Sequence, residues 1–152
     1  LAEPAKKNHK TLEINRNSLI EKDCVWEKSN ELLSFNETDI GGLSTLDSFT
    51  KSDKHAIKRK KGNKYLVKTI SLLDLLKKHK APKLIDYLSI DTEGSEYQIL
   101  KNFNFNEYSF RIITIEHNFT KQREKIFNLL KEKGYKRIFE DISNVDDWYV
   151  IQ

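Results

Sequence analysis

Apolar residues recur along the chain in short blocks whose spacing alternates between strand and helix periods. The near-continuous apolar runs at 85–90 and 111–115 are typical of buried parallel strands. Apolar positions spaced at helical intervals within 72–76 and 126–130 predict one buried face on each of two helices. Because strands and helices alternate, the pattern predicts an α/β fold built in layers.

Capping and turn residues predict the remaining elements. Pro4 favours a helix start, Ser71 is a capping-box residue before the helix at 72–76, and Gly134 ends the last helix. Further elements are expected as helices at 5 to about 16 and 95–101, and as strands at 23–28, 31–35, 65–70, 135–142 and 148–151. The turn-rich residues between the last two strands predict an antiparallel hairpin. Residues 40–64 are polar and contain glycine, which predicts a long loop.

Length and composition indicate a single globular domain over residues 1–152, with a mixed, mostly parallel sheet closed by the antiparallel hairpin. Charged residues make up 33% and hydrophobic ones 38%, so a disordered chain is excluded. The net charge of +4 comes partly from the runs 58–61 and 77–80, which are expected to be solvated loops or helix ends. These runs are not interleaved with aromatic residues, so no nucleic-acid partner is expected.

The single cysteine, Cys24, excludes an internal disulfide framework and is predicted to be a core residue. It suits a reducing compartment, and a cytoplasmic location is expected. No apolar run approaches the roughly 20 residues of a membrane span, and no signal peptide is seen. The opening residues Leu1 and Ala2 have the character of a buried strand end, so we expect an N-terminally incomplete domain with further chain upstream.

Acidic residues follow the two apolar strands. Asp91, Glu93 and Glu96 surround Gly94 after the first strand, and the segment 116–118 (Glu-His-Asn) closes the second. Ligands in α/β sheets bind where the carboxyl ends of parallel strands meet the following helices. We therefore expect the acids to share one cleft. The alternative for Glu96 is a residue that simply faces solvent in the first helical turn.

The convergence can be stated as a distance. Asp91, Glu116 and His117 are predicted to lie at the same sheet edge, with the two carboxylates within about 10 Å, roughly two strand spacings. Opposite edges would exclude both a catalytic and a metal role for the pair.

The segment 85–96 resembles the signature of FkbM-type methyltransferases, an apolar strand ending in Lys-x-Asp-x-Glu-Gly-x-Glu. Other segments resemble further parts of that family in the same order, namely Leu1–Pro4, Thr69–Leu76, Ile112–His117 and Asp147–Tyr149. The chain departs from the family at Ser89, where the family has Lys. It also lacks the glycine-rich first strand and loop that cradle the methionine part of the cofactor.

The resemblance implies a Rossmann-like class I methyltransferase fold that uses S-adenosylmethionine. The acceptor it implies is a hydroxyl of a sugar, glycan or polyketide-like molecule. Cofactor contacts are expected at Glu3, Asp91, Glu93 and Gly94, with Glu3 accepting hydrogen bonds from the ribose hydroxyls. The alternatives are a helix-start acid at Glu3, a helix N-cap at Asp91 and a simple backbone turn at Gly94. The segment 41–44 is a further candidate for the pocket wall.

Three residues are candidates for catalysis: Asp91, Glu116 and His117. Methylation of an alcohol removes its proton, and a histidine titrates close to the working pH. The alternative for His117 is a buried histidine with satisfied hydrogen bonds. Asp91 with Glu116 or Asn118 would also suit a hard divalent ion such as Mg²⁺.

Two other functions compete with methyl transfer. The acids Asp91, Glu93, Glu96 and Glu116 could hold ions that activate water in a metal-dependent hydrolase or nuclease. Alternatively, the chain is an inactive methyltransferase-fold fragment that serves as a binding or oligomerising module. An absent central strand would leave unpaired edges on both sides, which favours a homo-oligomer.

Overall fold

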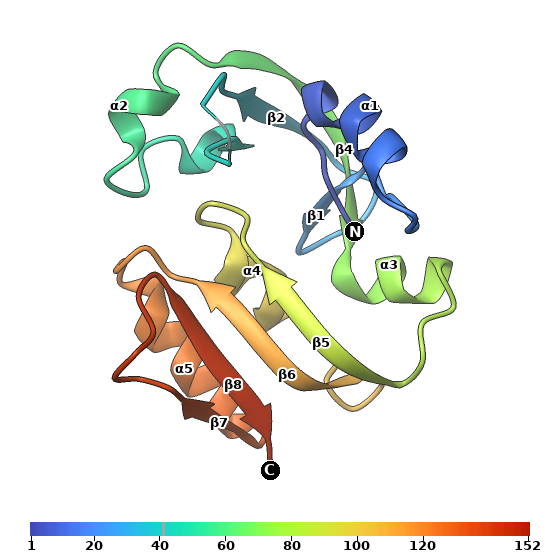
Figure 1. The fold of residues 1–152 in the computed structure, drawn as a ribbon, viewed down its shortest axis with the longest axis vertical. Helices are drawn as coiled ribbons and strands as arrows, with labels where there is room; N and C mark the ends of the chain where they lie inside the picture. The colour runs from blue at the N-terminus through green and yellow to red at the C-terminus, as the bar shows by residue number, and fades with distance from the viewer. Residues whose placement is uncertain (41) are drawn as a thin grey trace.

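Two four-stranded sheets make up the strand framework of the computed structural model, which describes residues 1–40 and 42–152. The first sheet has the order β1 (Cys24–Trp26), β4 (Asn63–Ser71), β2 (Leu32–Glu37) and β3 (Thr45–Leu46). The second has the order β5 (Leu84–Ile90), β6 (Ser109–Glu116), β8 (Asp146–Ile151) and β7 (Tyr135–Ile138). The chain completes the four strands of the first sheet before it enters the second (Figure 1).

The α/β class is confirmed, but the expectation of one mostly parallel sheet is wrong. Among the strand pairs of the described residues, β1–β4 and β5–β6 are parallel, whereas β2–β3, β2–β4, β6–β8 and β7–β8 are antiparallel. The apolar pattern indicates whether a strand is buried, but it does not indicate which strand is its partner. For this reason the sequence did not predict that the strands divide into two sheets. The predicted C-terminal hairpin is confirmed, with Ile138 opposite Trp148.

The main helices follow the sequence pattern closely. They are α1 (Lys6–Asn15), α3 (Leu72–Lys78), α4 (Glu96–Lys101) and α5 (Gln122–Glu132). Ser71 caps α3, because its Oγ accepts a hydrogen bond from the Asp74 N–H at 3.1 Å. Among the described residues, no helix has the length and apolar character that crossing a membrane requires.

The predicted long loop at 40–64 has more structure than expected. It contains β3, a 3₁₀ turn at Asp47–Phe49 and the short helix α2 (Ala56–Arg59), and β4 begins at its end. The side chain of Leu46 is buried in the smaller of two hydrophobic clusters. This burial explains why a polar segment without clear periodicity is ordered here.

Two hydrophobic cores lie beneath the two sheets. The smaller one joins Ala5, the N-cap residue of α1, to the first sheet through Cys24, Phe35, Leu46 and Val67. The larger one lies between the second sheet and helices α4 and α5, centred on Leu100, Phe110, Ile113, Leu130 and Tyr149. Helix α3 follows a strand of the first sheet, yet its leucines pack against the larger core, so this helix ties the two halves together. Cys24 is buried as predicted.

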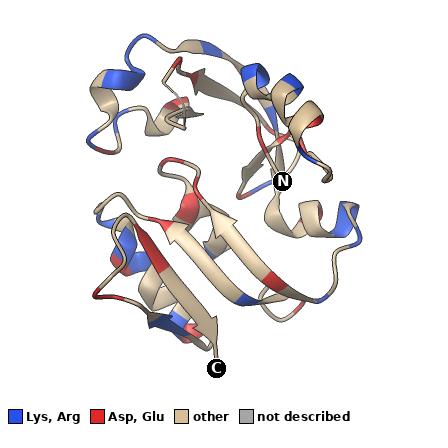
Figure 2. Ribbon diagram, in the orientation of Figure 1, with Lys and Arg blue, Asp and Glu red and all other residues tan. Residues whose placement is uncertain are grey.

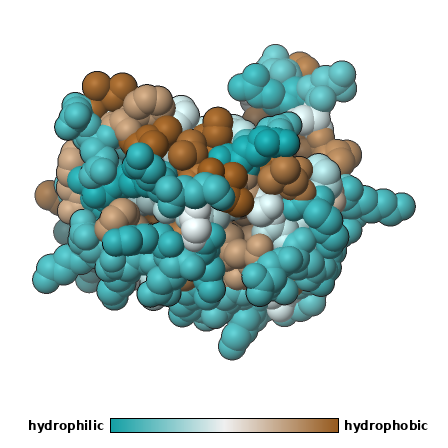
Figure 3. All heavy atoms as spheres, turned by 90° about the horizontal axis from the view of Figure 1, so that it is seen from below, coloured by the Kyte–Doolittle hydropathy of each residue, from teal (hydrophilic) through white to brown (hydrophobic). Residues whose placement is uncertain are grey.

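The β5 strand has a partner on one side only, namely β6, in the part of the chain that the structure describes. A groove of about 610 Å³ separates its other edge from Leu1 and Ala2. Apolar side chains of β1, α3 and β5 line this groove, including Val25, Leu75 and Leu88. In the view from below, hydrophobic residues gather in a hollow between polar flanks (Figure 3). The edge that the sequence predicted to be unpaired therefore borders an apolar groove.

Candidate functional site

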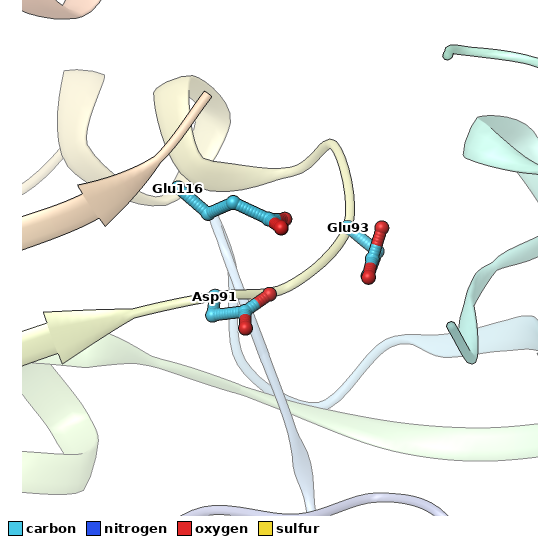
Figure 4. Close-up of side chains that lie close together, drawn as sticks. All are labelled: Asp91, Glu93 and Glu116. Carbon is cyan, nitrogen blue, oxygen red and sulfur yellow. The ribbon is translucent and has the colours of Figure 1, made fainter. Parts of the chain in front are cut away.

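The two acidic strand ends meet at one edge of the second sheet. Asp91 directly follows β5 and Glu116 ends β6, and the parallel register pairs Ile90 with Ile115 immediately before them. One carboxylate oxygen from each of Asp91, Glu93 and Glu116 lies within 4.8 Å of the other two (Figure 4). The predicted convergence of Asp91 and Glu116 is confirmed, because this distance is well inside the expected 10 Å.

Asp91 and Glu116 share a hydrogen bond, and their proximity controls their protonation. Partial burial, followed by the neighbouring Asp91 charge, raises the pKa of Glu116 to about 9. Burial also raises the pKa of Asp91, while the hydrogen bond from Glu116 opposes that rise. Ionising two adjacent carboxylates at once has a high electrostatic free-energy cost, so the pair holds one proton at neutral pH.

Glu93 reaches the pair from the loop after β5. Its side chain is only 5% exposed and its backbone is left-handed, with φ of 59°. Its Oε2 accepts hydrogen bonds from Arg59 Nη2 at 2.5 Å and from Asn118 Nδ2 at 3.4 Å. Burial raises the pKa of Glu93 to about 7, and the Arg59 charge limits this rise. The arginine therefore favours the ionised form.

Gly94 allows the loop after β5 to pack closely against the segment that contains Phe49 and Ser52. Its φ is +120°, and a Cβ at this position would lie 2.8 Å from Ser52 Oγ and 3.2 Å from Phe49 Cβ. The predicted turn is confirmed, and the close approach is made by the chain itself.

The alternative that Glu96 simply faces solvent is wrong, because the residue is 3% exposed. Its Oε1 accepts hydrogen bonds from the Thr92 N–H at 2.9 Å and from the Gly94 N–H at 3.0 Å. The tight turn leaves these N–H groups without carbonyl partners, and the Glu96 carboxylate satisfies them. Glu96 thus stabilises the turn of residues 91–95, which we call the acidic loop.

A cavity of about 240 Å³ opens beside Asp91. Its walls come from the N-terminal segment, the first sheet, the 42–46 segment and the acidic loop; they include Glu3, Asn8, Cys24, Phe35, Gly42, Ser44, Leu46, Asp91, Thr92 and Ser95. Gly42 and Ser44 are pocket-lining residues as predicted, whereas the neighbouring candidate Gly41 lies outside the described residues. The cavity also shares Ala2, Val25, Asp91 and Thr92 with the apolar groove, so the two spaces meet at the acidic loop.

Glu3 lines this cavity while it also anchors the start of α1. Its Oε1 accepts from the Ala5 N–H at 2.8 Å, and its Oε2 accepts from Asn8 Nδ2 at 3.0 Å. The helix-start alternative is therefore realised. Each carboxylate oxygen has a second lone pair, so the same residue can still accept a hydrogen bond from a ligand hydroxyl.

His117 turns its ring toward protein groups rather than the carboxylate pair. Its Nδ1 accepts a hydrogen bond from the Phe119 N–H at 3.0 Å, so the ring proton of the neutral form is on Nε2. The Nε2 atom lies 3.7 Å from a carboxylate oxygen of Asp147. Burial lowers the pKa of His117, which keeps the ring neutral. The ring is buried as the alternative expected, but its hydrogen bonds are only partly satisfied, because Nε2 is buried without a hydrogen-bond partner among the described residues.

Asp147 anchors an ion cluster that the sequence did not indicate. It is buried and accepts two hydrogen bonds from Arg123, at 2.9 and 2.7 Å, and one from Arg137 at 3.4 Å. These contacts join the start of α5 to the C-terminal hairpin. They also hold in place the loop between β6 and α5, which contains His117.

The predicted metal set was Asp91 with Glu116 or Asn118, whereas the structure groups Asp91, Glu93 and Glu116. Three carboxylates at this spacing are ligands that a hard divalent ion accepts. However, Arg59 already pairs with Glu93, and Asp91 and Glu116 already share a proton. The metal set therefore stays a prediction.

Sequence reasoning missed Arg59, which the run 58–61 suggested to be solvated. Its side chain is completely buried, although its neighbours Lys58 and Lys60 are exposed and the chain at the end of α2 is basic (Figure 2). Thr45 and Gln122 were also missed; they donate hydrogen bonds to the carbonyls of Glu93 at 3.0 Å and Gly94 at 2.7 Å. No motif separates Arg59 from its lysine neighbours, because its partners are remote in sequence.

An acid-lined cavity at the carboxyl ends of parallel strands is the ligand-site arrangement of α/β enzymes. A family model described as the methyltransferase FkbM domain matches residues 1–137, so the chain belongs to the FkbM methyltransferase family. This family is S-adenosylmethionine-dependent, and the match favours methyl transfer over the hydrolase and nuclease alternatives. The comparisons with curated proteins and with solved structures gave no significant match.

The two constraints on Gly94 can be separated by a pair of variants. Gly94→Ala should lower the free energy of unfolding by about 2–4 kcal/mol, because it adds a clash to an unfavourable φ. Gly134→Ala is the control, since its φ is +83° but a Cβ there meets nothing within 4 Å. It should cost only about 1–2 kcal/mol, the price of the left-handed backbone. Urea denaturation measures both, and equal losses would contradict the close approach.

The proton shared by Asp91 and Glu116 should make stability depend on pH. Because the folded pKa of Glu116 lies near 9 and its ordinary value is 4.5, the protonated form favours folding. Its contribution is complete below pH 4.5 and is lost as the pH rises to 9. After allowance for solvent screening, we expect the free energy of unfolding to fall by about 1–2 kcal/mol more than in Glu116→Gln. Denaturation at several pH values tests this, and parallel curves would contradict it.

Proposed function

We propose that this protein is an O-methyltransferase that transfers a methyl group from S-adenosylmethionine to an acceptor hydroxyl. The observation that carries the proposal is the close pair Asp91 and Glu116 in an FkbM-family chain, in which Asp91 lines the cavity and Glu116 lies behind it with a raised pKa. The acceptor class, a hydroxyl on a sugar, glycan or polyketide-like molecule, follows from the family resemblance.

The cavity and the adjoining groove are the proposed binding space for the cofactor. When bound, S-adenosylmethionine supplies an electrophilic methyl group on its sulfonium. Glu3 is proposed to accept hydrogen bonds from the ribose hydroxyls, which its remaining lone pairs allow. Asp91, Thr92 and Ser95 form the facing wall. At about 240 Å³ the cavity is smaller than typical ligand sites, so the ligand would also enter the groove that shares Asp91.

Asp91 is the proposed general base. It is exposed toward the cavity, whereas Glu116 is half-buried and has the higher affinity for the shared proton. Protonated Glu116 would donate a hydrogen bond to the Asp91 carboxylate and orient it. Asp91 would take the proton of the acceptor hydroxyl during methyl transfer and later release it to solvent. His117 holds the loop through the Phe119 N–H and takes no proton in this scheme.

The base assignment predicts a selective loss of turnover. Asp91→Asn should lower kcat by about 10²–10⁴-fold, the usual contribution of general acid–base catalysis. Asp86→Asn is the matched control, because Asp86 is an exposed residue of the same strand and pairs with Arg111 away from the cavity. The release of S-adenosylhomocysteine with a panel of hydroxylated saccharides and polyketides measures this. Equal activity of Asp91→Asn and the unmodified protein would remove Asp91 as the base.

The ribose assignment predicts a loss of cofactor affinity. Glu3→Ala should weaken the binding of S-adenosylmethionine by about 1.5–3 kcal/mol, the range for hydrogen bonds to a charged group. Glu13→Ala is the control, since Glu13 is exposed on α1 and pairs only with Lys22. Calorimetry measures affinity, and circular dichroism checks that α1 survives the loss of its starting acid. Unchanged affinity in Glu3→Ala would remove Glu3 from the site.

A further inference from the structure

Arg59 is a fully buried arginine at the C-terminal end of the short helix α2. Its guanidinium forms a fork with Asp53, with both N–O distances at 2.9 Å. The same group donates to Glu93 Oε2 at 2.5 Å, and its Nε donates to the Leu43 carbonyl at 2.8 Å. A buried cation of this kind is stable only when its donors are satisfied by such partners.

The remote partners of Arg59 lie within two different walls of the cavity. Leu43 stands between the lining residues Gly42 and Ser44, and Glu93 directly follows the lining residue Thr92. One guanidinium therefore spans from the 42–46 wall to the acidic loop. Lysine could not make these contacts together, because its ammonium lacks the planar fork of the guanidinium.

A second contact reinforces the same junction. Thr45 Oγ1 donates to the Glu93 carbonyl at 3.0 Å, and Gly94 packs closely against Phe49 and Ser52. The segment 43–59 thus rests on the acidic loop through polar and van der Waals contacts. Arg59 supplies the only charged attachment among the contacts described for this junction.

We propose that Arg59 is a positioning residue of the methyltransferase. It holds the Glu93 carboxylate beside Asp91 and Glu116, and it keeps the segment 43–59 closed against the cofactor cavity. Arg59 touches neither cofactor nor acceptor and acts through Glu93 and Leu43. The inference rests on the proposed function only where it concerns cofactor binding.

The test is a double-mutant cycle with Arg59→Lys and Glu93→Gln. Arg59→Lys keeps the buried charge but loses the fork, and Glu93→Gln keeps the shape but loses the charge. The controls are Lys58→Gln and Lys60→Gln, exposed neighbours in the same basic run. Two measurements are made on each variant: calorimetry with S-adenosylhomocysteine, and hydrogen exchange of peptides covering 43–59 and β5–β8.

Each single variant should weaken S-adenosylhomocysteine binding by about tenfold and speed exchange in 43–59, while β5–β8 stay protected. The double variant should be no weaker than the worse single variant, because both remove the same link. The controls should bind as the unmodified protein does. Additive losses, unchanged exchange in 43–59, or lost protection throughout β5–β8 would each overturn the positioning role.

The experiment also separates this inference from the proposed function. If the unmodified protein does not bind S-adenosylhomocysteine, the cofactor proposal fails, and the exchange data alone decide the role of Arg59. If it binds but Arg59→Lys binds equally well, the positioning role fails while the cofactor proposal stands.

Discussion

The ion pair between Arg59 and Glu93 joins two parts of the chain that no described strand pairing connects. Arg59 belongs to the segment that packs on the first sheet, and Glu93 to the loop that follows the first strand of the second. Both charges are buried, so either one alone would carry a large desolvation penalty. The pair therefore exists only when the segment 43–59 and the acidic loop are in contact. The cavity wall and the position of the acids depend on that contact.

The site itself arises from parallel strand geometry combined with charge repulsion. Parallel pairing of β5 with β6 brings Asp91 opposite Glu116, and partial burial then makes two negative charges costly. The outcome is one retained proton in a cavity wall. An ordinary carboxylate titrates far below neutral pH, whereas this pair can bind and release a proton in the working range of an enzyme.

Local sequence signals predicted the elements well because their causes are local. The cap at Ser71, the turn at Gly94 and the apolar runs of β5 and β6 depend on neighbours within a few residues. Glu96 was misjudged for a different reason. Its acceptors are required by a turn whose N–H groups have no other partner, and helix periodicity carries no information about that turn.

By itself, the sequence determined the α/β class, the FkbM-type signature and the meeting of Asp91 with Glu116, because strand order along the chain and acid position are written in it. Only the tertiary structure decided that the strands form two sheets, that His117 faces Asp147, and that Arg59 is buried. These features depend on contacts between residues far apart in the chain. Their energies come from burial and pairing, and neither is visible in a run of four basic residues or in an isolated histidine.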